Sequence, residues 1–262
     1  MKAAKYIISL LILLYALEGM GQADQRRVPA YVGEELEYII AYGFVNSGAA
    51  KIIFEYDSIS GDYHIKAAAR TIGLANVIYR ILDVYECYLD TLTGLPVKAI
   101  RNIREGNYRN YNEVTFDHSS RQDSCIIHSQ RSGTKAVDKN ILDILSGFYE
   151  LRKNYITPDM KEGALIIIRT YFTDEIWDLK VRYMGKETVR TQYGKVRCLK
   201  FNPVTEVGRA FKTEEDMTVW FSDDKNNIPV KIRVELRLGS FKVSLSGYEG
   251  LKYDFSSLKS KK

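Results

Sequence analysis

The side chains of this sequence that could most readily transfer a proton are those of its three histidines. His64 and His128 lie in alternating, strand-like segments, and His118 follows Asp117 in a polar turn. Neighbouring side chains of an extended segment point to opposite sides, so this Asp–His pair does not indicate a catalytic dyad. The sequence contains no nucleophile elbow, zinc-protease helix, P-loop or dinucleotide fingerprint. We therefore expect a non-catalytic protein with neither metal nor cofactor; a hydrolase built on two carboxylates is the remaining enzymatic alternative.

The three cysteines, Cys87, Cys125 and Cys198, have none of the short spacings that are typical of a metal site. Because their number is odd, they can form at most one disulfide within the chain. Cys87 and Cys198 lie in strand-like segments, where a buried, unreactive thiol is common. The sequence leaves open whether any two of the three are bonded.

Segment 223–227, Asp-Asp-Lys-Asn-Asn, offers oxygen atoms at the close spacing that a Ca²⁺ site needs. Lys225 stands in the middle of this segment, and no Glu follows at the position that closes a calcium loop. The related segment that begins at Asp90 lacks the further carboxylate. We therefore expect a plain turn here, without a metal.

These two segments belong to an internal repeat, in which residues 88–109 align without a gap on residues 221–242. Seven pairs are identical at this offset of 133 residues: Asp83/Asp216, Asp90/Asp223, Pro96/Pro229, Val97/Val230, Lys98/Lys231, Arg104/Arg237 and Gly106/Gly239. An Asp at the end of a strand can bond the backbone two residues on and begin a turn. A Pro is tolerated as the first residue of a strand. The repeat therefore predicts the same β-hairpin twice.

The N-terminus has the organisation of a signal peptide, residues 1–21. Two lysines precede an unbroken apolar stretch, residues 6–16, and Gly19 and Gly21 place small residues before a cleavage site at Gln22. The apolar stretch is shorter than the about 20 residues that span a bilayer. We expect an exported, periplasmic protein that is soluble after cleavage. An uncleaved membrane anchor is the alternative.

The rest of the chain alternates apolar and polar residues in short runs that predict β-strands. After a linker, residues 22–32, we expect one domain over 33–256, followed by a basic tail, 257–262. The domain consists of two similar β halves, about 33–131 and 163–256. The formal net charge of +5 is small and dispersed, and no nucleic-acid-binding motif occurs, so nucleic acid is not an expected partner.

Two helices interrupt the strands. Apolar residues at helical spacing predict a main helix at about 139–153, with Asp138 or Asn140 as its cap and Arg152 near its end, as the helix dipole prefers. A short helix is expected at about 74–82. The fold class is thus mainly β (α+β), a large antiparallel sheet built from two halves.

Four stretches resemble the bacterial exported family catalogued as domain of unknown function 3108: GEELEYIIAYGFVNSGAAKI, ILDVYECYLDTLTGLPVKAIRNIREGNY, ILDILSGFYELRK and EDMTVWFSDDKNNIPVKI. This resemblance covers most of residues 33–247; it implies fold and export and brings no catalytic residue. The hairpin pattern alone is similar to periplasmic carriers of the LolA/LolB type. That similarity implies a curved half-barrel with both helices packed on its concave face.

We therefore expect a binding or carrier protein of the cell envelope. If the main helix covers an open groove, Ile141, Leu145, Phe148 and Tyr149 would line it and contact a lipid or another apolar ligand. Alternatively, the helix fills the core. A second hypothesis is recognition of a glycan or an envelope protein through Tyr108 and Tyr111, because tyrosine combines stacking area with a polar tip.

Overall fold

The computed structural model describes residues 31–204, 213, 216–236 and 239–259. The expected signal peptide, its cleavage site and nearly all of the expected linker lie outside these residues. No helix in the described part of the chain is both long and apolar enough to cross a membrane.

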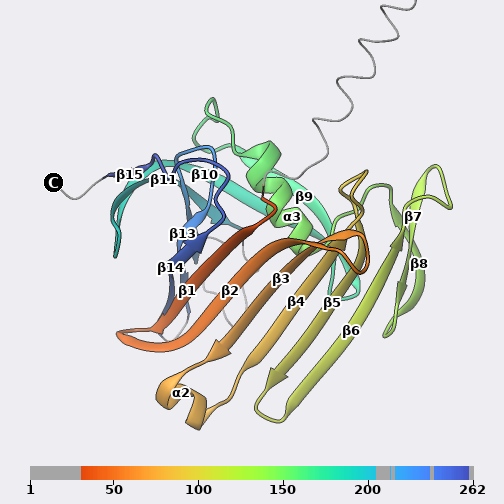
Figure 1. Ribbon diagram of the computed structural model, residues 1–262, viewed down its shortest axis with the longest axis horizontal. Coiled ribbons are helices and arrows are strands. Elements are labelled where there is room, and N and C mark those ends of the chain that lie inside the picture. Colours follow the sequence, from red (N-terminus) through yellow and green to blue (C-terminus); the bar gives the residue numbers. More distant parts are fainter. Residues whose placement is uncertain (1–30, 205–212, 214–215, 237–238, 260–262) are drawn as a thin grey trace, which may run out of the picture.

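Fifteen strands form one antiparallel sheet, in the order β8-β7-β6-β5-β4-β3-β2-β1-β14-β13-β12-β11-β10-β9, with β15 pairing on β11. The first wing consists of β1 (Glu34–Tyr42), β2 (Val45–Asp57), β3 (Asp62–Thr71), β4 (Leu82–Leu89), β5 (Pro96–Glu105), β6 (Tyr108–Asp117), β7 (Ser124–Ser129) and β8 (Gly133–Asp138). The second wing consists of β9 (Leu165–Phe172), β10 (Glu175–Thr191), β11 (Gly194–Pro203), β12 (Met217–Ser222), β13 (Pro229–Glu235), β14 (Ser240–Glu249) and β15 (Leu258–Lys259). The pairing of β1 with β14 joins the wings into a curved sheet (Figure 1). This confirms the predicted fold class.

The internal repeat forms the hairpins β4–β5 and β12–β13. Pro96 and Pro229 begin β5 and β13, as predicted. In each hairpin the strand register shifts next to the loop. On the side of the shift away from the loop, an aromatic residue faces the repeated lysine: Tyr88 lies opposite Lys98, and Trp220 lies opposite Lys231. The lysine Nζ lies over the aromatic ring in both copies, at 4.1 and 4.9 Å from the ring centroid. The repeat thus preserves a cation–π pair as well as a turn.

The two repeated aspartates were expected to have the same role, but the structure gives them different ones. Asp90 accepts hydrogen bonds from the backbone N–H groups of Leu92 and Thr93, which confirms it as a turn former. In the second copy, the prediction for Asp223 was wrong: Asp224 accepts the N–H of Asn226. The second loop, between the paired Phe221 and Pro229, is one residue longer than the first, between the paired Leu89 and Pro96. The extra residue moves the turn one position on.

The main helix begins later than predicted. Residues 144–150 form α3 (Ile144–Glu150), and a π-helical turn, η1 (Leu151–Tyr155), continues it. Asp143 caps the helix in place of the expected Asp138 or Asn140: its carboxylate accepts the N–H groups of Leu145 and Ser146. The preceding segment is extended, because Leu142 pairs with β9 and accepts a backbone hydrogen bond from Tyr171 at 2.7 Å.

The short helix α2 (Gly73–Ile78) forms, but none of its residues is buried. It connects β3 to β4 at the end of the sheet that is remote from α3 (Figure 1). The expectation that both helices pack on the concave face is therefore correct only for α3. Ser257, the first residue of the expected basic tail, is buried and donates to the Asp224 carboxylate at 2.6 Å.

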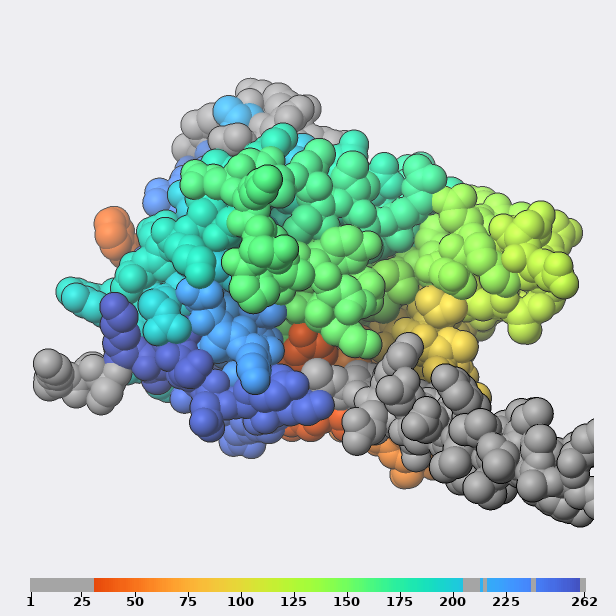
Figure 2. Space-filling view, turned by 90° about the horizontal axis from the view of Figure 1, so that it is seen from above, coloured from red at the N-terminus to blue at the C-terminus, as the bar shows by residue number. Residues whose placement is uncertain are grey.

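Seen from above, the green helical segment sits between the blue strands of the second wing and the yellow-green strands of the first (Figure 2). Its side chains join the cores of both wings: Leu151 packs with Phe201 and Phe221, and Tyr149 packs with Phe54 and Ile65. The buried faces are those that strand alternation assigns to the interior. The helix therefore holds the two wings at a fixed distance.

A buried ion pair anchors the helix. Arg152 and Glu34 are 0% and 2% exposed, and two guanidinium nitrogens donate to the two carboxylate oxygens at 2.7 and 2.6 Å. Arg152 also donates to the backbone carbonyls of Asn226 and Asn227, at 3.0 Å each. Burial lowers the pKa of Arg152, but the charge and hydrogen bonds of Glu34, together with Tyr149 and Tyr31, outweigh burial and raise this pKa above its ordinary value. The pair thus ties the helix to β1 and to the loop of the second repeat copy.

All three cysteines are free thiols, buried in separate strands. Burial raises the pKa of Cys125 to about 11 and that of Cys198 to about 12, and it raises the pKa of Cys87 well above its ordinary value. These thiols are therefore poor nucleophiles at neutral pH.

Replacing Arg152 by Met should lower the free energy of unfolding by about 3–5 kcal/mol, because the Glu34 carboxylate is left buried without its partner. A second change, Glu34→Gln, should recover part of this loss. Urea unfolding followed by circular dichroism measures both. The control is Arg169→Met, which breaks exposed ion pairs to Asp138 and Asp178 and should cost less than about 1 kcal/mol. A loss for Arg152→Met no larger than that of the control would contradict the anchoring role.

Candidate functional site

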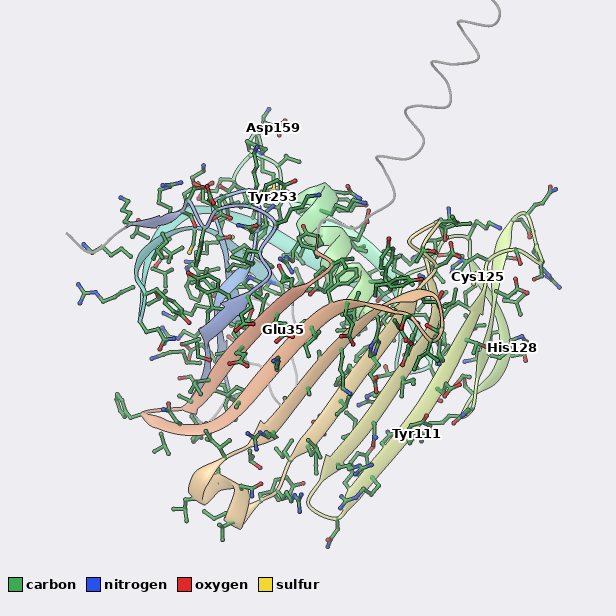
Figure 3. All side chains as sticks on the ribbon, viewed as in Figure 1. Glu35, Tyr111, Cys125, His128, Asp159 and Tyr253 are labelled. Carbon is green, nitrogen blue, oxygen red and sulfur yellow. The ribbon has the colours of Figure 1, made fainter. Side chains whose placement is uncertain are left out.

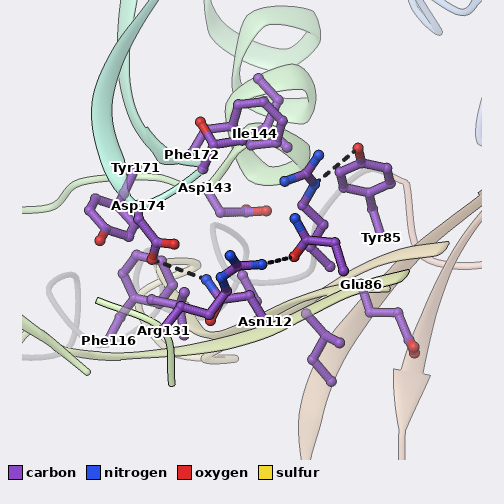
Figure 4. Close-up of a pocket in the computed structure, with 16 residues that line it drawn as sticks. Tyr85, Glu86, Asn112, Phe116, Arg131, Asp143, Ile144, Tyr171, Phe172 and Asp174 are labelled. Carbon is purple, nitrogen blue, oxygen red and sulfur yellow. Dashed lines mark hydrogen bonds between the residues drawn. The ribbon is translucent and has the colours of Figure 1, made fainter. Parts of the chain in front are cut away.

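A cavity of about 170 Å³ opens on the concave side, between strands β4–β6 and the turn that joins β9 to β10. Its polar atoms come from residues far apart in the sequence, as Figure 4 shows for Asn112, Arg131 and Asp174. Alternation along β6 explains much of the lining: its inward positions are apolar near α3, at Val114 and Phe116, and polar farther down, at Asn110 and Asn112. Register brings them together, with Arg101 opposite both Tyr85 and Asn112.

Asp174 closes one side of the cavity. It occupies a two-residue turn in which both Thr173 and Asp174 have positive φ, 51° and 66°, a conformation that Asp tolerates better than most residues. Its carboxylate accepts hydrogen bonds from Asn112 (3.0 Å), Ser129 (2.5 Å) and Ser132 (3.0 Å). The turn of the second wing is thereby latched onto β6, β7 and the β7–β8 turn of the first.

Burial raises the pKa of the Asp174 carboxyl, but the hydrogen bonds from Ser129, Ser132 and Asn112 outweigh burial and hold this pKa below its usual value. The carboxylate is therefore charged at neutral pH and already supplied with donors. It shapes the cavity and leaves little capacity to accept a proton from a ligand.

Two arginines, Arg101 and Arg131, line the cavity beside the carboxylates of Asp143 and Asp174. The guanidinium of Arg101 lies between the rings of Tyr85 and Phe172, at 5.9 and 5.8 Å from their centroids. Arg131 donates to the side-chain oxygen of Asn110. Within the described ranges neither guanidinium has a carboxylate oxygen within 4 Å. Their remaining N–H groups can bind a carboxylate or phosphate in a two-pronged manner.

The opposite wall is apolar. Val114 and Phe116 of β6 face Ile144, at the start of α3, and Tyr171 of β9. The cavity therefore combines an apolar wall with a polar side that carries two arginines and the Asp174 carboxylate. This composition suits a small amphipathic group that is anionic at one end.

The four helix residues predicted to line a groove lie elsewhere. Ile141 and Tyr149 are buried in hydrophobic clusters, and Leu145 and Phe148 are half-buried against the same cores. None of them lines this cavity, whose helical contribution comes from Ile144 and the capping Asp143. The helix thus fills the space between the wings. A ligand-contacting role for the four residues stays a prediction.

Tyr108 and Tyr111 are exposed at the lower end of β6, with Tyr111 well away from α3 (Figure 3). Each hydroxyl bonds a side chain two residues further on, Tyr108 with Asn110 and Tyr111 with Glu113. Residues three apart on a strand point to opposite faces. The two rings therefore do not form one stacking platform.

The histidines lie apart from the cavity and from one another. His64 lies on the outer face of the sheet but is only 8% exposed, because it is stacked on Tyr88 at 4.4 Å and bonded to the Glu86 carboxylate at 2.9 Å. His118 bonds the carbonyl of Pro96, and burial lowers its pKa. In the part of the chain that the structure describes, no three His, Cys, Asp or Glu residues are grouped as metal ligands. The oxygens of the 223–227 segment instead bond within the protein.

The chain belongs to the family described as protein of unknown function (DUF3108), whose model matches residues 37–246. Among solved structures, it is similar to a β-barrel-like protein of domain of unknown function DUF1849 from Brucella abortus, at a TM-score of 0.55 and 11% identity, over 85% of this chain and 98% of that one. A DUF1089 family protein from Pseudomonas aeruginosa matches with a TM-score of 0.31 and 10% identity, over 74% of this chain and 87% of the other. No curated protein matches the sequence.

The similarity to the Brucella protein extends to the fold alone, as expected at 11% identity. The expected similarity to carriers of the LolA/LolB type is not shown by these comparisons and stays a prediction. The sequence could not have indicated Arg101, Asn112, Arg131 and Asp174 as one site, because they come from different strands and turns. Only the pairing of the strands brings them together.

Asp174→Asn should lower the free energy of unfolding by about 2 kcal/mol at pH 7, because it removes the charge that strengthens three hydrogen bonds. The pKa of Asp174 in the folded protein lies below its unfolded value of about 3.9. The stability that the charged carboxylate contributes is therefore fully present above about pH 3.9 and is lost as the pH falls through the folded pKa. Urea unfolding at pH 7 and pH 3 should therefore show a difference between variant and wild type that shrinks at the lower pH.

The control for this experiment is Asp159→Asn, an exposed aspartate whose bond is to the neighbouring Thr157 hydroxyl. It should change stability much less than Asp174→Asn does. Equal effects of the two changes at pH 7 would show that Asp174 does not latch the wings together.

Proposed function

We propose that this protein is a non-catalytic binding protein of the cell envelope, and that it holds an amphipathic ligand with an anionic end in its concavity. The observation that carries the proposal is the meeting of Arg101 and Arg131 with an apolar wall in one cavity. Arg101 is half-buried without an ion pair, and an anion would stabilise it; Arg131 is exposed at the edge of the cavity, where it could bind the same anion. Export, inferred from the N-terminal sequence, places the protein in the envelope, where such amphiphiles occur.

The size of the cavity limits what enters it. Its volume of about 170 Å³ is close to that of a protein cavity that holds benzene, roughly 150 Å³. The cavity therefore accepts a head group or a few carbon atoms, and the rest of a longer ligand must lie outside it.

The remainder of the concave face has room for that part. Beyond the helix, the inward positions of β2 and β3 carry alanines, with Ala50 paired with Ala69 and Ala67 opposite Ile52. Small side chains leave a shallow apolar trough that continues from the core. A lipid chain or another elongated apolar group fits this trough, and its anionic end would reach Arg101.

The first test looks for a bound ligand in protein purified from cells. Native mass spectrometry, followed by solvent extraction, should find an amphiphile in a one-to-one ratio with the chain. The N-terminal residue determined on the same sample tests export and cleavage before Gln22. Protein that carries no amphiphile and binds none when titrated with a fluorescent fatty acid would overturn the proposal.

The double variant Arg101→Gln/Arg131→Gln should weaken binding of a dansyl-labelled fatty acid at least tenfold, because it removes charge-assisted hydrogen bonds to the carboxylate. Fluorescence titration measures the dissociation constant. The matched control is Arg104→Gln, on the same strand as Arg101 but pointing to the other face, where it bonds Asn102. Equal affinities of the double variant and wild type would exclude the two arginines as the anion-binding groups.

A further inference from the structure

Five large apolar side chains gather at the end of the sheet remote from α3. Two come from the β1–β2 turn and its edge, Phe44 and Val45, and three from α2, Leu74, Val77 and Ile78; we call this set the apolar rim. Their exposed fractions lie between 64% and 105%. In Figure 1 the β1–β2 turn and α2 lie at the same lower end of the sheet.

Hydrogen bonds hold the two parts of the apolar rim side by side. The N–H of Ile72, which precedes α2, donates to the carbonyl of Ser47 at 2.9 Å. On the other side of α2, the N–H of Gly106 donates to the carbonyl of Arg80 at 2.8 Å, which ties the β5–β6 turn to the same surface. The rim is thus a continuous part of the fold's lower end.

Nothing in the fold requires these side chains to be apolar. α2 has no buried residue, so its leucine, valine and isoleucine contribute nothing to the core. A helix of six residues is also too short to be stable by itself in water. Single exposed apolar residues are ordinary, but five at one end of a sheet, three of them on one short helix, point to an interaction surface.

The residues around the rim indicate what it contacts. Arg80 and Arg109 are exposed, and in the described ranges neither forms an ion pair; Arg109 donates only to the carbonyls of Gly106 and Tyr108. Tyr79 and Tyr108 are about half exposed beside them. Apolar side chains flanked by tyrosine and arginine are typical of segments that enter a membrane–water interface. The arginines favour a surface of anionic lipid head groups.

We propose that the apolar rim docks on the surface of a bilayer that contains anionic lipids. Phe44, Val77 and Ile78 would enter the interface, with Arg80 and Arg109 at the level of the head groups. Docking here brings the open end of the concave face to the membrane, so that an amphiphile can pass between bilayer and trough. The transfer of a ligand between bilayer and trough rests on the proposed binding function.

Co-sedimentation with vesicles of phosphatidylcholine and phosphatidylglycerol tests the docking. The protein is used as it is recovered from cells, so that wild type and variants share one N-terminus. Wild type should bind, and Phe44→Ser/Val77→Ser/Ile78→Ser should bind at least tenfold more weakly. The matched control, Ile59→Ser/Leu92→Ser, removes side chains that are 96% and 68% exposed at the opposite end of the strands, and it should bind like wild type. Equal loss in both variants, or no binding by wild type, would overturn the proposal.

A second comparison tests the electrostatic part. Arg80→Gln/Arg109→Gln should weaken binding to these vesicles, as should added salt, and neither should matter for vesicles of phosphatidylcholine alone. Wild-type binding that is equally strong to both kinds of vesicle would contradict a role for anionic head groups.

The same variants separate docking from ligand binding. The triple rim variant should bind the dansyl-labelled fatty acid in solution with wild-type affinity, because its changes lie outside the cavity. Wild type that binds the fatty acid but no vesicles would overturn docking and leave the binding function standing. Wild type that binds vesicles but no fatty acid would overturn the binding function and leave docking standing.

Discussion

The rest of this structure depends on the buried ion pair between Arg152 and Glu34. Two charges taken out of water are costly unless their hydrogen-bonding groups are satisfied. Here the guanidinium meets both carboxylate oxygens and two backbone carbonyls, and it lies 4.3 Å from the ring centroid of Tyr31. The helical segment supplies Arg152, and its partners come from β1, from Tyr31 before β1 and from the loop of the second repeat copy. Their geometry can be satisfied only when both wings and the helix are in place.

One end of the curved sheet is therefore fixed, and the other is open. At the fixed end, the helix fills the interior, and Asp174 latches the β9–β10 turn onto the first wing. The cavity forms where the packed core gives way to the open trough, which is why an apolar wall and two arginines meet there. Farther along, alanines line the concave face and the apolar rim completes the open end. Core, cavity and apolar rim thus succeed one another along the length of the strands.

The sequence predicts the local structure of this protein well and its long-range contacts poorly. Alternation and the repeated Asp and Pro residues indicate strands and hairpins because these signals are local. The start of α3 was misplaced because Leu142 is drawn into pairing with β9, a partner that the sequence does not reveal. Arg152 illustrates the same limit: its place at a helix end suggested a dipole interaction, whereas its partner Glu34 lies 118 residues away. Arg101 and Asp174 likewise become neighbours of one cavity only through strand order.

An amphiphile bound in the concavity, as proposed, has its anionic end at the two arginines. Photo-crosslinking with a fatty acid that carries a diazirine close to its carboxylate, followed by peptide mass spectrometry, tests this most directly. We expect labelling in β5, β6 and the β9–β10 turn, and we expect an excess of unmodified fatty acid to suppress it. Labelling confined to the outer surface, or distributed without preference over the chain, would contradict it.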